Sequence, residues 1–271
     1  MKIIDAHIHT NFHHPELATF AKEEKIPFSW NYLQRQLNQH NVAGAIIITS
    51  DHNNPTPGEE ALLTSQRKQD QRLFPVCSIH PDYTTRADVN KVEKLLQEKA
   101  LFGMKILPGY HPVYPSDQKY HAFYTLAEKY KVPVIIHTGD TFGSHHLVKY
   151  AHPLDVDEIA VRFPKTTFIL AHLGNPWVRD AAELVLKNEN VYADLSAFCL
   201  SHPDKHDLQR ITQDLNFALN YSGRPDKFLF GTDWPLVDIG SYIDTIKKAV
   251  PHKHHQKVFF ENANKIFKMG L

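Results

Sequence analysis

The sequence opens with an apolar segment that carries two histidines one residue apart, IIDAHIH at residues 3–9. Side chains alternate between the two faces of an extended strand, so His7 and His9 are expected on the same side. Two imidazoles held by one strand form half of a metal site, and Asp5 on that side can orient one of them by accepting a hydrogen bond from its ring N–H. The alternatives are surface histidines and, for Asp5, a carboxylate near solvent at the strand start.

Three further polar residues follow apolar segments later in the chain. His137 ends VPVIIH, His172 ends FILAH, and Asp233 ends FLFGTD. Each one alone is better explained as a hydrogen-bonded residue at a strand end, and Asp233 as the cap of a turn. Because all of them fall where a strand is expected to end, we predict that they meet His7 and His9 around one cavity.

Short apolar runs alternate with amphipathic helical patterns along the whole chain. The runs predicted as strands are residues 3–7, 44–49, 74–79, 101–107, 132–137, 167–172, 190–195 and 227–232. Eight buried strands, each followed by helix, favour an α/β fold of the (β/α)8 TIM-barrel type over an open doubly wound sheet. No linker or repeat interrupts residues 1–271, so we predict a single barrel domain. Ser29 is the expected N-cap of the first helix, which begins near Trp30.

Long connections follow five of the predicted strands, at residues 10–28, 50–58, 108–116, 138–153 and 196–205. In a barrel these connections emerge at the carboxyl ends of the strands, where active sites are built. The candidate residues and the long loops are therefore predicted at the same rim.

Charge and composition restrict the partners. Lys and Arg total 30 and Asp and Glu total 30, with no long basic run, which argues against nucleic acid or an anionic membrane as the main partner. No apolar stretch is long enough to span a bilayer, and no leader is recognisable. We expect a cytoplasmic protein with a small-molecule substrate and free thiols at Cys77 and Cys199. The sequence leaves the oligomeric state open, with a homodimer as the common state of such barrels.

Four motifs in this order resemble the amidohydrolase superfamily, closest to its amidohydrolase-2 branch. They are DAHIH at residues 5–9, IIHTG at 135–139, LAHLG at 170–174 and FGTDWP at 230–235, and ENANKIF at 261–267 resembles the C-terminal signature of the branch. This branch includes aminocarboxymuconate-semialdehyde decarboxylase and related decarboxylases, hydrolases and hydratases. The resemblance implies the fold and a metal site but not the substrate.

Carried over residue by residue, the resemblance implies that His7, His9, His137 and Asp233 hold a divalent ion. His172 would stand beside it, and the catalytic residues would be Asp233 and His172. Three imidazoles and a carboxylate suit Zn²⁺, with Mn²⁺, Fe²⁺ or Co²⁺ as alternatives. One ion is favoured and a second stays open. Asp233 is expected to accept or return a proton, and His172 to bind the attacking water or to polarise a substrate carbonyl.

Lys105 departs from an apolar strand pattern, in LFGMKIL at residues 101–107. An ammonium inside a barrel is costly, so we expect Lys105 to be paired, carbamylated or in contact with an anionic substrate. The alternative is an amine that extends to the rim. Nucleases of the TatD type resemble the first and last strands but typically carry a carboxylate on the fourth strand, so Lys105 disfavours them. Tyr110 and Trp177 are further candidates for the substrate pocket.

Three functions remain open at this point. The first is a metal-dependent hydrolase that cleaves a carbonyl C–N or C–O bond in an amide, ester or lactone. The second is a lyase, namely a non-oxidative decarboxylase or hydratase acting on an unsaturated or aromatic carboxylic acid. The third is a barrel without activity that binds a ligand, which the complete set of polar residues disfavours.

Overall fold

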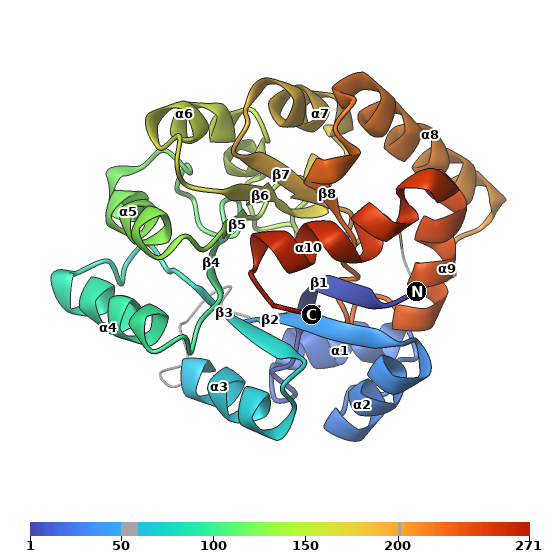
Figure 1. Cartoon of the computed structure of the whole chain (residues 1–271), viewed down its shortest axis with the longest axis horizontal. Coiled ribbons are helices and arrows are strands. Elements are labelled where there is room, and N and C mark those ends of the chain that lie inside the picture. Colours follow the sequence, from blue (N-terminus) through green and yellow to red (C-terminus); the bar gives the residue numbers. More distant parts are fainter. Residues whose placement is uncertain (50–58, 200–201) are drawn as a thin grey trace.

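The computed structural model describes residues 1–49, 59–199 and 202–271. Its eight parallel strands are hydrogen-bonded in sequence order, with the helices packed around them (Figure 1). The strands are β1 (Ile3–His9), β2 (Val42–Ile48), β3 (Leu73–Ser78), β4 (Gly103–Ile106), β5 (Val134–Ile136), β6 (Phe168–Leu170), β7 (Val191–Asp194) and β8 (Phe228–Leu229). Every predicted strand is present, with ends that differ by a few residues.

Backbone hydrogen bonds connect the last strand to the first. The amide of Ala6 donates to the carbonyl of Phe230 at 2.8 Å, and the amide of Asp233 donates to the carbonyl of His7 at 2.7 Å. The amide of His9 donates in turn to the carbonyl of Trp234 at 2.8 Å. The sheet therefore closes on itself, which confirms the predicted (β/α)8 barrel and excludes the open doubly wound sheet.

Helices follow the strands and cover the outer face of the barrel. The α-helices are α1 (Pro15–Glu23), α2 (Trp30–Gln39), α3 (Glu59–Gln69), α4 (Arg86–Gln97), α5 (His121–Tyr130), α6 (Asp155–Arg162), α7 (Val178–Lys187), α8 (Lys205–Ser222), α9 (Ile239–Ala249) and α10 (Asn262–Ile266). Short helical turns are η1 (Gln118–Tyr120), η2 (Val148–Ala151), η3 (Ala171–Gly174), η4 (Pro225–Lys227), η5 (His252–His254) and η6 (Lys257–Glu261). None of the helices within the described ranges is long and apolar enough to cross a bilayer.

Two local predictions have different outcomes. The Oγ of Ser29 accepts a hydrogen bond from the amide of Tyr32, which confirms Ser29 as the N-cap of α2. The connection 10–28, in contrast, was expected to be a loop but contains α1. This helix buries only Leu17 and Ala21, so its apolar periodicity is too weak to stand out in the sequence. The predicted loop 50–58 lies outside the described residues.

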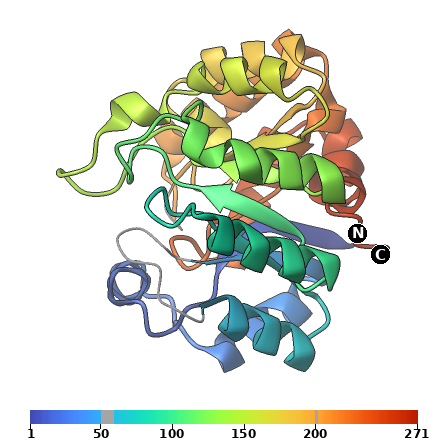
Figure 2. The same cartoon turned by 90° about the vertical axis from the view of Figure 1, so that its left-hand side faces the viewer.

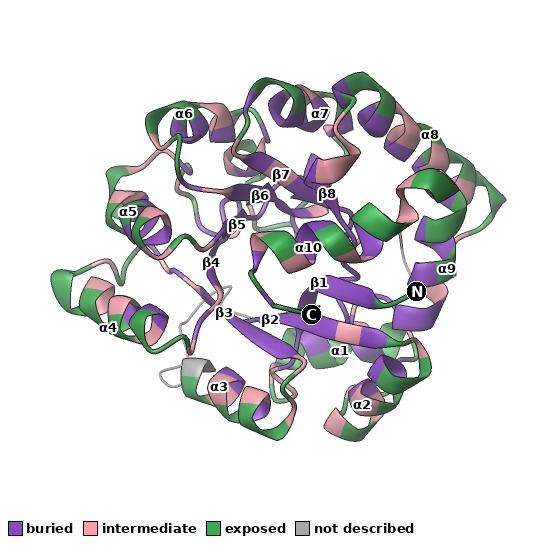
Figure 3. Ribbon diagram, in the orientation of Figure 1, coloured by how far each residue is buried: buried purple, intermediate pink, exposed green. Residues whose placement is uncertain are grey.

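Apolar side chains fill the half of the barrel interior that lies toward the amino ends of the strands. Side chains such as Ile4, Ile135 and Leu229 form a buried cluster with Phe267 and Met269 from the C-terminal segment. In Figure 1, α10 lies across the end of the barrel where both chain termini are found. Figure 2 shows the loop that follows β5 extending from the opposite end. The buried residues follow the strands and the inner faces of the helices (Figure 3).

Polar residues therefore have one open end of the barrel available to them, at the carboxyl ends of the strands. Cys77 and Cys199 are both free thiols, as predicted. Cys77 is buried, whereas Cys199 is only partly buried because it follows β7 in a loop.

Candidate metal centre and active site

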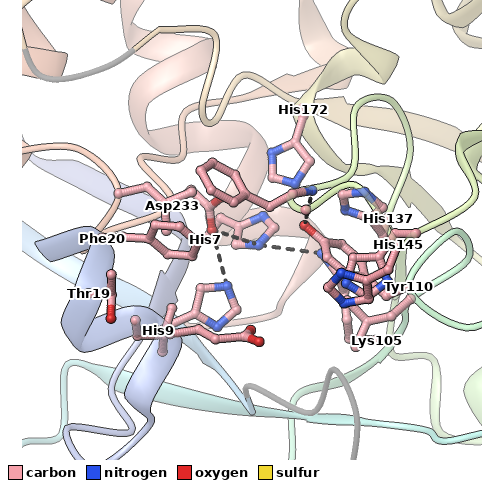
Figure 4. Close-up of a pocket in the computed structure, with 17 residues that line it drawn as sticks. His7, His9, Thr19, Phe20, Lys105, Tyr110, His137, His145, His172 and Asp233 are labelled. Atoms are coloured by element: carbon pink, nitrogen blue, oxygen red, sulfur yellow. Dashed lines mark hydrogen bonds and ion pairs between the residues drawn. The ribbon is translucent and has the colours of Figure 1, made fainter. Parts of the chain in front are cut away.

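Six of the predicted site residues gather at the carboxyl ends of the strands (Figure 4). They are His7 and His9 of β1, Lys105 of β4, His137 directly after β5, His172 in η3 after β6, and Asp233 after β8. All six line one pocket of about 220 Å³, and Tyr110 lines it as well. The convergence of segments more than 200 residues apart in the chain is the geometry that the strand-end pattern predicts.

His7, His9 and Asp233 form the tightest group in the pocket. The Oδ1 of Asp233 lies 3.4 Å from Nε2 of His7 and 3.1 Å from Nε2 of His9. The other ring nitrogens are already engaged: Nδ1 of His7 lies 2.9 Å from Oδ2 of Asp194, and Nδ1 of His9 lies 3.2 Å from the carbonyl oxygen of Ile48. Because both of these oxygens only accept, both imidazoles carry their proton on Nδ1.

The two Nε2 atoms and Oδ1 of Asp233 therefore face one another with lone pairs. Oδ1 is buried, and no described residue donates a hydrogen bond to it. Burial and the nearby Lys105 lower the pKa of His7 to about 4 despite the opposing carboxylates, so its imidazole is neutral at pH 7. The amine of Lys105, 3.4 Å from Nε2 of His7, can donate to one of these three lone pairs, but the contact between Nε2 of His9 and Oδ1 of Asp233 stays repulsive unless a cation lies between them. The donor set therefore fits a divalent cation.

The spacing also suits a divalent cation such as zinc. Ligand atoms about 2.0–2.1 Å from a tetrahedral zinc lie about 3.3 Å from one another. The measured separations of 3.1 and 3.4 Å are close to this value. Burial opposes ionisation of Asp233, but the positive charge that the neighbouring imidazoles carry once they are protonated at acid pH outweighs burial and holds the pKa of this carboxyl well below its usual range. Asp233 is thus ionised at neutral pH, which suits it to hold a cation.

His137 lies at the same pocket but makes a different contact. Its ring centroid is 5.2 Å from that of His172 and 4.7 Å from that of Tyr110. Nε2 lies 3.0 Å from the carbonyl oxygen of Asp140, so this nitrogen carries the proton and Nδ1 has the lone pair. Among the described residues, the groups of ligand atoms within 4.8 Å of one another do not include His137. Its part in metal binding stays a prediction.

His172 stands beside the metal-binding group. Its ring centroid is 5.0 Å from that of His7, and its backbone has φ 60° and ψ 18°, in the left-handed region that is unfavourable for a side chain. Such strain persists only where neighbours enforce it. Here the backbone amide of His172 donates to Oδ1 of Asp194 at 3.0 Å.

Asp194, at the end of β7, was missed in the sequence analysis. This fully buried carboxylate accepts from the ring of His7 and from Ser196, as well as from the backbone of His172. Burial opposes its ionisation, but the hydrogen bond that it accepts from His7, the charge of His7 once it is protonated at acid pH, and the charge of Lys105 outweigh burial and hold its pKa well below the usual range. A weaker signal was present, because Asp194 is the last residue but one of the predicted strand 190–195, whereas His137 and His172 end their predicted strands.

His7, His172 and Asp194 also place ligand-type atoms within 4.8 Å of one another. Hydrogen bonds already join Asp194 to His7 and to the backbone of His172, however. The group with His9 and Asp233 is consequently the better cation site.

Asp5 does not orient an imidazole, so that expectation is wrong. Its carboxylate accepts from the amide and hydroxyl of Thr232, at 2.9 and 2.7 Å, and from the amide of His7. The pairing of β1 with β2 shifts register between Asp5 and Ile8, so simple alternation does not continue along the strand. Asp5 instead ties the end of β8 to β1.

Lys105 is 1% exposed and does not extend to the rim, which rules out that alternative. Its Nζ lies 3.4 Å from Nε2 of His7. Burial lowers the pKa of Lys105 to about 8, although Asp194 and Asp233 oppose the change. The amine thus lies at the bottom of the pocket beside the cation site.

A second lobe of about 210 Å³ adjoins the first and shares His137, His172, Asp233 and Tyr110 with it. Trp177 lines neither lobe within the described part of the chain and packs against His152, with ring centroids 4.8 Å apart. The structure thus brings Tyr110, but not Trp177, into the cleft.

Residues to which we assigned no role line the mouth of the first lobe. They are Glu16, Phe20, Phe142, His145 and His146. Phe20 of α1 and Phe142 of the loop after β5 meet with ring centroids 4.1 Å apart, so two segments remote in sequence partly cover the pocket. Their contribution depends on loop packing, which periodicity does not encode.

Solved structures similar to this chain share its fold. An amidohydrolase from Burkholderia multivorans with bound zinc is 16% identical over 99% of each chain, with a TM-score of 0.76. A probable 2-pyrone-4,6-dicarboxylic acid hydrolase from Acinetobacter baumannii is 17% identical over 99% of this chain and 100% of that one, with a TM-score of 0.71. A dihydroxybenzoic acid decarboxylase from Polaromonas with bound manganese is 17% identical, with coverage of 100% and 98% and a TM-score of 0.71.

At these identities the likeness to solved structures shows the fold alone. No curated protein matched the sequence. The amidohydrolase family model, in contrast, matches residues 4–269, which is nearly the whole chain. The chain, with its barrel and a His/Asp group that could hold a cation, therefore belongs to the amidohydrolase family, in the amidohydrolase-2 branch.

Proposed function

We propose that this protein is a metal-dependent hydrolase that cleaves a carbonyl C–N or C–O bond in an amide, ester or lactone of a small molecule. The observation that carries the proposal is the group of His7, His9 and Asp233, whose lone pairs meet at the floor of a cleft. A divalent cation there supplies activation of water, since it lowers the pKa of an adjacent water from about 15.7 toward 7.

The other roles in the proposed reaction belong to residues of the chain. Asp233 and the two β1 imidazoles would hold the cation, and His172, whose ring centroid lies 5.0 Å from that of His7, would take a proton from water within the cleft. Tyr110 shapes both lobes, and burial raises the pKa of its phenol well above the usual range, so it stays neutral and acts as a hydrogen-bonding group. Zn²⁺ is the ion we favour, with one ion per chain.

A decarboxylase or hydratase is the second candidate, and Lys105 is the observation that favours it. A buried ammonium in the pocket is suited to an anionic group of the substrate, such as the carboxylate of an aromatic or unsaturated acid. The same ammonium would serve equally well in a hydrolase whose substrate carries a carboxylate. Lys105 therefore bears on the charge of the substrate more than on the type of reaction.

A two-part assay tests the proposal. Protein loaded with zinc or manganese is given a panel of lactones, esters and amides, and separately a panel of aromatic and unsaturated acids with detection of carbon dioxide. Hydrolysis that Asp233→Asn abolishes supports the first function, and carbon dioxide release supports the second. Elemental analysis showing a protein that takes up no metal would instead favour the binding barrel.

A further inference from the structure

Two residues of β7 and its following loop connect the imidazoles of His7 and His172. Asp194 and Ser196 are both fully buried. Oδ2 of Asp194 accepts from Nδ1 of His7 at 2.9 Å, and Oδ1 accepts from the hydroxyl of Ser196 at 2.5 Å. The same hydroxyl lies 2.8 Å from Nδ1 of His172. A continuous hydrogen-bonded chain thus runs from a metal-binding imidazole to the second imidazole of the cleft.

The direction of each bond in this chain follows from counting protons. A serine hydroxyl has one proton, and the ionised carboxylate of Asp194 can only accept it. Ser196 must then accept from Nδ1 of His172. The carbonyl oxygen of Ser196, 3.3 Å from the same nitrogen, also requires a donor there. Both contacts place the proton of neutral His172 on Nδ1.

With the proton on Nδ1, neutral His172 has its lone pair on Nε2. His172 lines both lobes of the cleft, and its backbone is held in the left-handed region by the bond from its amide to Asp194. One carboxylate therefore fixes the backbone of His172 directly and its ring through Ser196. In this state His172 accepts a proton or a hydrogen bond but cannot donate one to a substrate carbonyl.

We propose that Ser196, held by Asp194, is a positioning residue that keeps His172 in the tautomer with the proton on Nδ1, so that His172 serves the cleft as a proton acceptor. This inference deepens the proposed function and rests on it for the role of His172 in turnover. It decides between the two roles that the sequence leaves open for this histidine. Attack by water on a carbonyl requires the acceptor.

Nitrogen-15 NMR of histidine-labelled, zinc-loaded protein reads the tautomer without any substrate. His172→Gln identifies the signals of His172. We expect the wild-type spectrum to show protonated Nδ1 and unprotonated Nε2 at neutral pH, and Ser196→Ala to show a mixture of tautomers. A wild-type signal from protonated Nε2 of His172 would overturn the inference. This readout needs only the wild type and the His172→Gln variant used for assignment.

Kinetics provides the second readout on the substrate found in the panel. Ser196→Ala is expected to lower kcat about 10-fold or more, with KM changed less than about 3-fold, because proton transfer and not binding is affected. Ser196→Thr, which keeps the hydroxyl, should restore most of kcat. Ser222→Ala is the matched control, since among the described residues this buried serine bonds only within α8 and its neighbouring turn, and it should leave kcat unchanged.

The two failures are distinguishable. A protein that hydrolyses nothing in the panel but shows the Nδ1 tautomer refutes the proposed function and retains the structural assignment. A protein that hydrolyses its substrate with equal kcat in wild type and Ser196→Ala refutes the positioning role of Ser196 and leaves the function intact.

Discussion

Nδ1 of His7 lies 2.9 Å from Oδ2 of Asp194, and this contact decides which nitrogen of His7 faces the cleft. Since the carboxylate fixes the proton on Nδ1, the lone pair on Nε2 is directed to the position beside Asp233. If His7 binds the proposed cation, a partner on another strand orients this ligand, which is the common arrangement for histidine ligands. β7 would then control the proposed metal site without supplying a ligand to it.

Asp194→Asn should weaken metal binding by about 10–100-fold. Oδ1 of Asp194 receives three donors, so an asparagine keeps its oxygen there and turns its amide nitrogen toward His7. Two donors then face each other, and His7 is driven to the tautomer with the proton on Nε2, where the cation binds. Zinc affinity is measured by competition with a chelating dye. Asp244→Asn, on the exposed side of α9, is the control, and equal affinities for the wild type and Asp194→Asn would refute the argument.

The effect of Asp233→Asn on the free energy of unfolding should have opposite signs in metal-free and in zinc-loaded protein. In metal-free protein, Oδ1 of Asp233 faces two lone pairs, and an amide at this position can donate to one of them. We expect the free energy of unfolding of the metal-free variant to rise by about 1–3 kcal/mol. With zinc the wild type becomes the more stable protein, because a cation that binds only the folded state stabilises it.

Urea unfolding with and without chelator measures both cases for Asp233→Asn. Activity should fall by about 10³-fold or more, as expected for loss of a ligand that also moves a proton. A metal-free variant that is markedly less stable than the wild type would show that Asp233 is held by contacts other than the cation.

The sequence pattern predicts the barrel and the metal-binding group because both depend on strand ends. His7, His9, His172 and Asp233 each follow an apolar run, and parallel strands bring their carboxyl ends together whatever the details of packing. The mouth of the cleft could not be predicted in this way. The contact between Phe20 and Phe142 joins two connections whose paths are set by tertiary packing.

Asp5 and Asp194 illustrate the same limit within the strands. Both are buried carboxylates on strands of the sheet, but a register shift in β1 turns Asp5 toward Thr232, whereas Asp194 meets the imidazole. Alternation assigns a face only where the pairing is regular.

Lys105→Met tests whether the substrate is anionic. Methionine fills the space of the lysine stem without a buried charge, so the fold and the metal content should be retained. If Lys105 binds a carboxylate of the substrate, KM should rise about 10–100-fold, which corresponds to one hydrogen bond to a charged group. KM is measured for the carboxylic acid that proves to be a substrate in the panel and for the corresponding neutral amide. An equal change in KM for both compounds would place Lys105 in the metal site and not in substrate recognition.

Asp5 should make the protein less stable as pH rises. Burial raises the pKa of Asp5 to about 7 in the folded chain, although the hydrogen bonds from Thr232 oppose the increase, while the ordinary value is 3.8. Between these values the unfolded chain has released the proton that the folded chain retains, so stability falls with increasing pH from about 4 to about 7. One pKa unit corresponds to about 1.4 kcal/mol, so the total loss from Asp5 is several kcal/mol.

Asp5→Asn isolates this effect from the opposite one of His7. Burial lowers the pKa of His7, so the folded chain resists taking up a proton that the unfolded chain accepts, and this histidine reduces stability as pH falls. The difference in unfolding free energy between Asp5→Asn and the wild type cancels the contribution of His7. Measured by urea unfolding of metal-free protein at pH 4 to 8, this difference should increase in favour of the asparagine and level off above about pH 7. A difference that does not vary with pH would mean that Asp5 is ionised throughout, with its charge fully compensated by Thr232 and the amide of His7.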